Sequence, residues 1–242
     1  MFRKNILEIE NHIITLLKEN YPEHNISRDY FTLLHECQFA NATVFRYNDG
    51  NLDITIKDFS GSPWIVRNTF GRFFIKTEGK SMLSLNGNPS VSSHVKFLSP
   101  YTVAFSFIRG KALKQCPGHS ISKEFFINLE NNIKEMHKKD IVHLDLRNLG
   151  NIIMGKDGYP YIIDFQSCIS TKHFPKKLKE LLRKVDISGA YKCWKNSCVE
   201  PLDPTREKFL EDFNSKRKFW ILRGYPLQRF IKKIKQNFNK EF

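Results

Sequence analysis

Three side chains near residue 150 have the types and the spacing that phosphoryl transfer requires. Asn151 follows Asp145 at a short distance, and Asp164 comes after a predicted hairpin. One carboxylate can orient an acceptor hydroxyl, while an amide oxygen and a second carboxylate can hold Mg²⁺ against phosphate groups. The three residues therefore predict phosphoryl transfer from ATP, with ATP and Mg²⁺ as cofactors. The alternative is an ordinary helix–loop–hairpin whose loop residues are simply polar.

Two elements flank these residues and would position them. Apolar residues at helical spacing predict a long helix over 122–139. Segments 151–154 and 159–163 are apolar and flank a Gly-Lys-Asp-Gly turn, which predicts a β-hairpin. Asp145 would then lie between the helix and the hairpin, and Asp164 would lie at the hairpin's end.

The first hundred residues have mostly strand-like patterns, between a helix at the start and another over 64–85 that carries Glu78. In one strand the apolar and polar residues alternate, so Thr55 and Lys57 share one face. The stretch before Pro117 is predicted to be a loop. The predicted strands are 30–34, 43–47, 52–57, 95–98 and 101–108.

The second half is predicted to be mainly helical, with later helices over 176–183, 187–194 and 205–218. This order predicts an α+β fold with two lobes and a ligand cleft between them. We expect a strand-rich N-terminal lobe over 1–108 and a helical C-terminal lobe over 109–242.

The motifs resemble those of the protein-kinase-like superfamily. His143-Leu144-Asp145-Leu146 is similar to its H-x-D-L catalytic loop, and Asp164-Phe165-Gln166 is similar to its Asp-Phe-Gly motif. Within the superfamily, the chain resembles the compact bacterial branch that includes RIO-type kinases and lipopolysaccharide core (Kdo/heptose) sugar kinases. The resemblance covers roughly residues 30–195 and implies a bilobal protein-kinase-like fold.

The resemblance also implies roles for the residues around the loop. Asp145 would be the catalytic base, and Arg147 would neutralise charge on the γ-phosphoryl group. Asn151 and Asp164 would bind Mg²⁺. The loop has one residue more than the usual pattern, so Asn148 and Asn151 bracket a slot that Gly150 occupies. Asn151 is preferred because it immediately precedes the predicted strand.

The first lobe would supply the nucleotide contacts. By the same resemblance, Lys57 would contact the α- and β-phosphates, Glu78 would pair with Lys57, and Thr55 would line the adenine pocket. Phe107 lies in the segment that resembles the interlobe hinge, whose backbone would hydrogen-bond adenine. The alternatives are a solvated lysine at a strand end, a surface carboxylate and a plain buried strand.

Three departures from the kinase pattern bear on the activity. The Gly-rich phosphate loop is replaced by residues 38–44, in which Ala40 and Ala42 still allow close backbone approach. Gln166 replaces the motif glycine. Few residues separate Asp164 from the next predicted helix, so the acceptor should be compact: a sugar hydroxyl or a Ser/Thr on a folded protein.

Asp186 resembles the aspartate that braces the catalytic loop, but a helix N-cap explains it equally well.

The net charge of +14 favours an anionic partner, such as a nucleotide, a nucleic acid, a phosphorylated glycolipid or a membrane surface. The alternative is a soluble protein with a solvated cationic face. A basic amphipathic helix is predicted from residue 227 onward, and it can contact an anionic membrane or pack on the second lobe. Five cysteines without a metal-site spacing, and no signal peptide, lead us to expect a cytoplasmic protein, with peripheral attachment to the inner membrane left open. The competing functions are a pseudokinase binding module and a charge-driven nucleic-acid-binding protein, although no recognised nucleic-acid motif is present.

Overall fold

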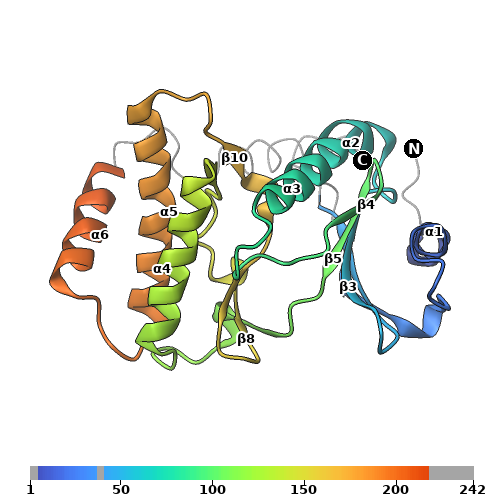
Figure 1. Ribbon diagram of the computed structural model, residues 1–242, viewed down its shortest axis with the longest axis horizontal. Helices are drawn as coiled ribbons and strands as arrows, with labels where there is room; N and C mark the ends of the chain where they lie inside the picture. Colours follow the sequence, from blue (N-terminus) through green and yellow to red (C-terminus); the bar gives the residue numbers. More distant parts are fainter. Residues whose placement is uncertain (1–4, 37–40, 218–242) are drawn as a thin grey trace, which may run out of the picture. The chain divides into compact units, whose positions relative to one another are not determined.

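The computed structural model describes residues 5–36 and 41–217 (Figure 1). The chain divides into two compact units, one ending at Pro201 and the other beginning at Leu202. Within the described part of the second unit, helix α6 (Pro204–Arg217) is capped by Asp203, whose Oδ1 accepts from the backbone N–H groups of Thr205 and Arg206. The basic helix predicted after residue 227 lies outside the described residues.

A five-stranded antiparallel sheet forms the first part of the larger unit (Figure 1). The strand order is β1-β2-β3-β5-β4, and all neighbours pair antiparallel. The five strands predicted from alternation and turn residues are confirmed close to their predicted bounds. They are β1 (Phe31–His35), β2 (Thr43–Asn48), β3 (Asp53–Asp58), β4 (Lys96–Ser99) and β5 (Thr102–Ser106).

The two faces of this sheet have different roles. Helix α1 (Ile6–Asn20) packs Ile13 against one face, where Phe45 and Ile56 are fully buried. Thr55 and Lys57 alternate with Ile56 along β3, so they lie on the other face. The predicted alternation is therefore confirmed, and it points Lys57 away from the apolar cluster around α1.

A helical segment follows β3 and carries Glu78, as predicted. It consists of α2 (Trp64–Val66), a π-helical stretch (Arg67–Gly71) and α3 (Arg72–Ser84). Gly71 allows this segment to approach Phe59 closely, because a Cβ at Gly71 would lie 2.9 Å from the Cβ of Phe59. Helix α3 buries Phe74 and Glu78 on one side, which fixes the direction of the Glu78 carboxylate.

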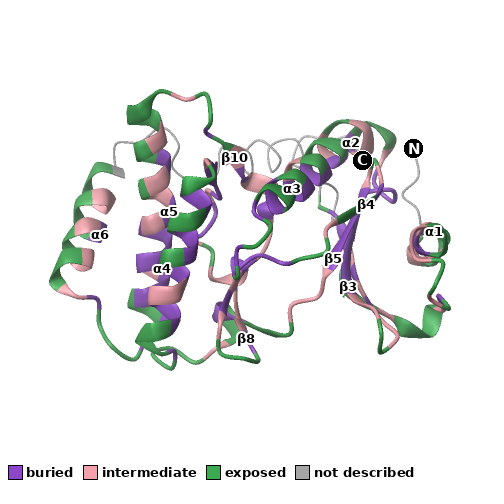
Figure 2. Cartoon of the chain, in the orientation of Figure 1, coloured by how far each residue is buried: buried purple, intermediate pink, exposed green. Residues whose placement is uncertain are grey.

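Two long helices dominate the rest of the larger unit. Helix α4 (Lys123–Lys138) begins after Ser122, whose Oγ accepts from the backbone N–H of Phe125. It packs on α5 (Lys176–Ser197), and the rings of Phe126 and Trp194 stack with centroids 5.5 Å apart. Figure 2 shows the buried residues along both helices. The prediction of separate helices over 176–183 and 187–194 is wrong, because α5 runs through without a break.

Short strands connect these helices to the residues of interest. The predicted hairpin is confirmed as β8 (Ile152–Gly155) and β9 (Pro160–Ile162), and β6 (Gly110–Ala112) pairs with β8. Strand β7 (Ile141–Val142) pairs with β10 (Ile169–Ser170) on either side of the loop and hairpin. The loop predicted before Pro117 is wrong for Gly110–Ala112, which form β6, whereas Leu113–Gln115 form only a short 3-10 turn.

The fold class α+β is confirmed: an antiparallel sheet comes first and mainly helices follow. The predicted lobe boundary between residues 108 and 109 lies in the link from β5 to β6, and it stays a prediction. Across residues 5–36 and 41–217, no helix is long and apolar enough to cross a membrane.

Candidate active site

Lys57, Glu78 and Asp164 form a cluster of one cation and two carboxylates. The Lys57 Nζ lies 2.7 Å from Glu78 Oε1 and 3.2 Å from Asp164 Oδ1. Lys57 and Glu78 are buried, whereas the side chain of Asp164 is 40% exposed. Three elements far apart in sequence (β3, α3 and the end of the hairpin) therefore meet at one ammonium group.

The pKa values of this cluster are set by burial and by mutual attraction. Burial by itself lowers the pKa of Lys57, but the two carboxylates outweigh it and raise that pKa above its usual range. Burial raises the pKa of Glu78, and Lys57 offsets only part of that effect. For the more exposed Asp164, attraction to Lys57 outweighs burial and lowers the pKa. Lys57 therefore keeps its proton, and Asp164 keeps its negative charge at neutral pH.

The backbone around Asp164 is held in an unusual conformation. Asp164 has φ 68° and ψ 60°, a left-handed conformation that residues other than glycine adopt at a cost. The next backbone N–H, that of Phe165, donates to Glu78 Oε1 over 3.3 Å. His143 contacts the residue before Asp164: the His143 Nε2 lies 3.1 Å from the Ile163 carbonyl oxygen. These contacts on both sides hold Asp164 in place.

Asp145 and Asn151 are joined directly. The Asn151 Nδ2 donates to the Asp145 carbonyl oxygen over 3.1 Å and to Asp145 Oδ2 over 2.9 Å. Both side chains are buried. The loop that we call the Asp145 loop (residues 143–151) therefore folds back on itself, and it brings two of the predicted site residues into contact.

Asp186 fixes the start of the Asp145 loop from inside α5. Its two carboxylate oxygens accept from the backbone N–H groups of His143 at 2.8 Å and Leu144 at 2.7 Å. His137 Nε2 lies 3.0 Å from the same carboxylate, which is fully buried. Leu144 has φ 66°, so this pairing also holds a strained residue. The N-cap interpretation of Asp186 is wrong, because the residue lies in the middle of a continuous helix.

Arg147 is anchored to α5. Its Nη1 donates to Ser188 Oγ over 3.0 Å, and Lys192 Nζ donates to the Arg147 carbonyl oxygen over 3.2 Å. Gly189 permits this close packing, because a Cβ there would lie 2.8 Å from the carbonyl carbon of Leu146 and 2.9 Å from the Arg147 nitrogen. The predicted role of Arg147 toward a phosphoryl group stays a prediction.

We expect Gly189→Ala to destabilise the protein by about 1–3 kcal/mol, because the added methyl group would push against the backbone of the Asp145 loop. Thermal unfolding measures the effect. Gly118→Ala is the matched control, since its added Cβ would meet its nearest atom at an ordinary 3.8 Å. Equal unfolding temperatures for the two variants would contradict the close-packing argument.

Thr55 and Phe107, the other predicted nucleotide contacts, lie on β3 and just after β5. Thr55 is buried on the same face as Lys57. The backbone N–H of Phe107 donates to the Asp53 carbonyl oxygen over 2.9 Å, so it is not available to a ligand. In the described part of the chain, neither backbone group of Ile108 has a hydrogen-bond partner. The backbone that could pair with a ligand is therefore that of Ile108 rather than the Phe107 N–H.

The ring of Phe107 belongs to a charged cluster that the sequence did not reveal. The Arg46 guanidinium lies 4.1 Å from the centroid of this ring and bonds both oxygens of Asp53. Arg109 binds the same carboxylate, at 2.6 Å. Burial by itself raises the pKa of Asp53, but the two arginines outweigh burial, so the pKa lies below its ordinary value. Arg46 lies on β2, Asp53 on β3 and Arg109 just after β5, so only the pairing of these strands brings the three residues together.

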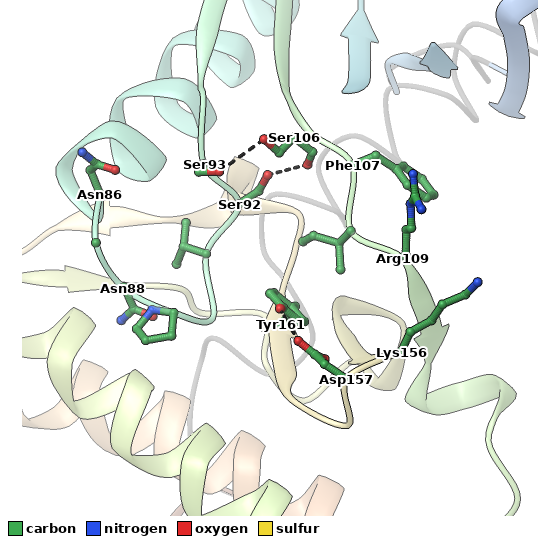
Figure 3. A pocket seen from close by; sticks show the side chains of 14 residues that line it. Asn86, Asn88, Ser92, Ser93, Ser106, Phe107, Arg109, Lys156, Asp157 and Tyr161 are labelled. Atoms are coloured by element: carbon green, nitrogen blue, oxygen red, sulfur yellow. Dashed lines mark hydrogen bonds between the residues drawn. The ribbon is translucent and has the colours of Figure 1, made fainter. Parts of the chain in front are cut away.

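A cavity of about 580 Å³ lies beside this segment (Figure 3). Figure 3 shows Ser92 and Ser93 near Ser106 on one side, with Asp157 and Tyr161 on another. Phe107 and Ile108 contribute to its lining, whereas Thr55 and Lys57 do not. The cavity and the Lys57 cluster are therefore lined by different residues.

The described residues contain no group of three or more His, Cys, Asp or Glu side chains that could hold a metal ion. Asn151 and Asp164 offer an amide oxygen and a carboxylate. Such hard oxygen ligands suit Mg²⁺, which usually takes only one or two protein carboxylates and completes its shell with water and phosphate oxygens. The partly exposed Asp164 carboxylate is open to such a ligand. The chemistry of these two side chains suits Mg²⁺, and the Mg²⁺ site itself stays a prediction.

The structure thus brings together Lys57, Glu78 and Asp164 in one cluster, and Asp145 and Asn151 in another. His143 links the two, because it lies in the Asp145 loop and contacts the residue before Asp164. Comparison of the chain with models of known protein families gives no match, and comparison with curated proteins gives none either.

Proposed function

We propose that the chain is an ATP- and Mg²⁺-dependent kinase with a bilobal protein-kinase-like fold, which transfers the γ-phosphoryl group to a hydroxyl acceptor. The single observation that carries the proposal is the contact of Lys57 Nζ with both Glu78 and Asp164. The sequence predicts these residues to be a phosphate-binding lysine, its partner and a metal ligand, and in the structure they lie within hydrogen-bonding distance.

The charge of this cluster favours a functional over a structural role. Burying ion pairs is costly, and well-packed apolar residues often stabilise a fold as well or better. With both carboxylates ionised, one cation leaves an excess negative charge, and Asp164 is partly open to solvent. A divalent cation would balance that excess, and clusters of charges with shifted pKa values are concentrated at functional sites.

In this proposal each group has one task. Lys57, held by Glu78, binds the α- and β-phosphates. Asp145 orients the acceptor hydroxyl and takes its proton, and Arg147 faces the transferring group. Asn151 and Asp164 hold Mg²⁺, which supplies charge neutralisation for the phosphates when bound.

The proposed contacts with the nucleotide base use Thr55, because Thr55 lies on the same face of the sheet as Lys57. The base would pack beneath Thr55 and pair with the free backbone groups of Ile108. The segment from β5 to β6 would then be the interlobe hinge, with the sheet and α3 forming one lobe and α4, α5 and the hairpin forming the other.

A compact acceptor is supported by the short segment after Asp164. Only residues 165–175 separate Asp164 from α5, which leaves little room for a platform for an extended peptide. The acceptor class is a Ser/Thr on a folded protein, in the manner of RIO-type kinases, or a sugar hydroxyl of an anionic glycolipid, in the manner of lipopolysaccharide core kinases. The basic composition favours an acceptor or membrane surface with negative charge.

The test is phosphoryl transfer from radiolabelled ATP into a fractionated lysate, with wild type and Asp145→Asn compared. We expect Mg²⁺-dependent labelling that falls at least about 10²-fold in the variant, because the amide cannot accept the hydroxyl proton. Asp212→Asn, on the exposed surface of α6, is the control and should label as wild type does.

Label in protein bands or in glycolipid would separate the two acceptor classes. Tight Mg-ATP binding without transfer would favour a pseudokinase. Equal transfer by wild type and Asp145→Asn would exclude the proposed base.

A further inference from the structure

We propose that Asn148 is a positioning residue for Asn151 and that it compensates for the extra residue in the Asp145 loop. The inference rests on the proposed function, because it concerns how this loop would hold Mg²⁺ with a nucleotide. A chain of hydrogen bonds carries it, from Gly150 through Asn148 and Asn151 to Asp145.

The first hydrogen bond fixes the orientation of Asn148. The backbone N–H of Gly150 donates to Asn148 Oδ1 over 3.0 Å. The NH₂ end of the same amide therefore faces Asn151, and its Nδ2 donates to Asn151 Oδ1 over 3.2 Å. If the Asn148 amide were flipped, an N–H group would face the Gly150 N–H and an oxygen would face the Asn151 oxygen.

Asn151 is fixed from its other end as well. Its Nδ2 donates to both the carbonyl oxygen and the Oδ2 of Asp145. A flipped Asn151 would place its Oδ1 against the Asp145 carboxylate and its Nδ2 against the Asn148 Nδ2. All three hydrogen bonds of the Asn151 side chain would then be lost. Both Asp145 and Asn151 are buried, so water cannot easily replace the lost partners.

This arrangement leaves the Asn151 oxygen suited to a metal ion. An amide oxygen has two lone pairs. The N–H group of Asn148 uses one of them and holds the oxygen in a defined direction, and the other can bind Mg²⁺. Groups that hydrogen-bond a metal ligand in this way commonly affect metal affinity by 10-fold or more.

The same residue accounts for the unusual loop length. Asn148 precedes a short 3-10 turn, Leu149–Asn151, and its carbonyl oxygen accepts from the backbone N–H of Asn151 over 2.9 Å. The turn takes up the additional residue and leads directly into β8 at Ile152. Asn151 therefore lies directly before strand β8, although one residue more separates it from Asp145 than in the usual kinase pattern.

The test is binding of Mn²⁺, measured by electron paramagnetic resonance in the presence of a non-hydrolysable ATP analogue. Asn148→Ser keeps an oxygen that can accept from the Gly150 N–H, but its side chain is too short to reach Asn151. We expect about a 10-fold weaker Mn²⁺ affinity, with an unchanged unfolding temperature and unchanged affinity for the analogue without metal. Asn131→Ser, on the exposed side of α4, should match wild type in all three measurements.

Each other outcome is decisive. Mn²⁺ affinity equal to wild type in a folded Asn148→Ser variant would overturn the inference and leave the proposed function intact. A loss of metal-free analogue binding together with a lower unfolding temperature would show a merely structural role and would also overturn it. If wild type binds no Mn²⁺ with the analogue, the proposed function fails, and the inference fails with it. Asn148→Thr provides the same comparison if the serine variant does not fold.

Discussion

Lys57→Met is expected to lower the free energy of unfolding by about 3–5 kcal/mol. The substitution keeps most of the apolar volume of the lysine but removes the ammonium that lies 2.7 Å from Glu78 and 3.2 Å from Asp164. Glu78 is 1% exposed, so its carboxylate would remain buried without a cation. Removing one partner of a buried ion pair costs more than the pair contributes, because the remaining charge stays uncompensated.

The loss of unfolding free energy in Lys57→Met should grow as the pH rises. Burial and the nearby Asp164 both raise the pKa of Glu78, and Lys57 is the group that opposes them. Without Lys57, the folded-state pKa of Glu78 rises further above its ordinary value of 4.5. A carboxyl group whose pKa is raised in the folded state stabilises the fold below its unfolded pKa, and that stabilisation is lost as pH rises through the folded pKa. The variant should therefore approach wild type in acid and fall behind it toward neutral pH.

Denaturant unfolding at several pH values measures this, and binding of a fluorescent Mg-ATP analogue supplies the functional readout. Lys57→Met should weaken analogue binding by at least about 10-fold, because the proposed phosphate ligand is missing. Lys76→Met, on the exposed side of α3, is the control. The double substitution Lys57→Met and Glu78→Gln should recover part of the stability but none of the binding. A single variant that matches wild type in both stability and binding would contradict the proposed site.

The Lys57 cluster was predictable because each member lies in an element with a strong local pattern. Alternation along β3 determined which face carries Lys57, and that pattern involves only neighbouring residues. Helical spacing placed Glu78 on the next helix, and the hairpin placed Asp164 at its end. The fold class followed from the same order of elements. What the pattern could not provide is the distance between the three side chains, which depends on how sheet, helix and hairpin pack.

The contacts that sequence reasoning missed depend on packing between distant segments. The break predicted between residues 183 and 187 is absent, and Gly189 lies inside α5, where a Cβ would lie 2.8 Å from the carbonyl carbon of Leu146. The three residues of β6 are too few for a periodic pattern, and they form a strand only because β8 lies beside them. The Arg46–Asp53–Arg109 cluster likewise forms only once β3 is paired with both β2 and β5.

Asp186→Asn is expected to cost about 3 kcal/mol of unfolding free energy and to lower phosphoryl transfer at least about 10-fold. The carboxylate accepts from two backbone N–H groups, those of His143 and Leu144, and it contacts His137. An asparagine has one oxygen, so in either orientation an NH₂ group would face a buried backbone N–H. Hydrogen bonds to a charged acceptor contribute about 1.5–3 kcal/mol each, and an unsatisfied buried donor adds its own cost.

The effect on transfer arises through the Asp145 loop. His143 and Leu144 are the two residues before Asp145, and Leu144 has the left-handed φ of 66° that this carboxylate helps to hold. Releasing them would let Asp145, the proposed base, move relative to Asp164, and small displacements of a catalytic group reduce rates strongly. Asp140→Asn is the matched control: Asp140 also has a positive φ, which asparagine tolerates, and its partners Lys179 and Arg183 are only partly buried, unlike those of Asp186. We expect that variant to transfer phosphate as wild type does. Full transfer by Asp186→Asn under conditions where it remains folded would show that the loop keeps its geometry without the brace.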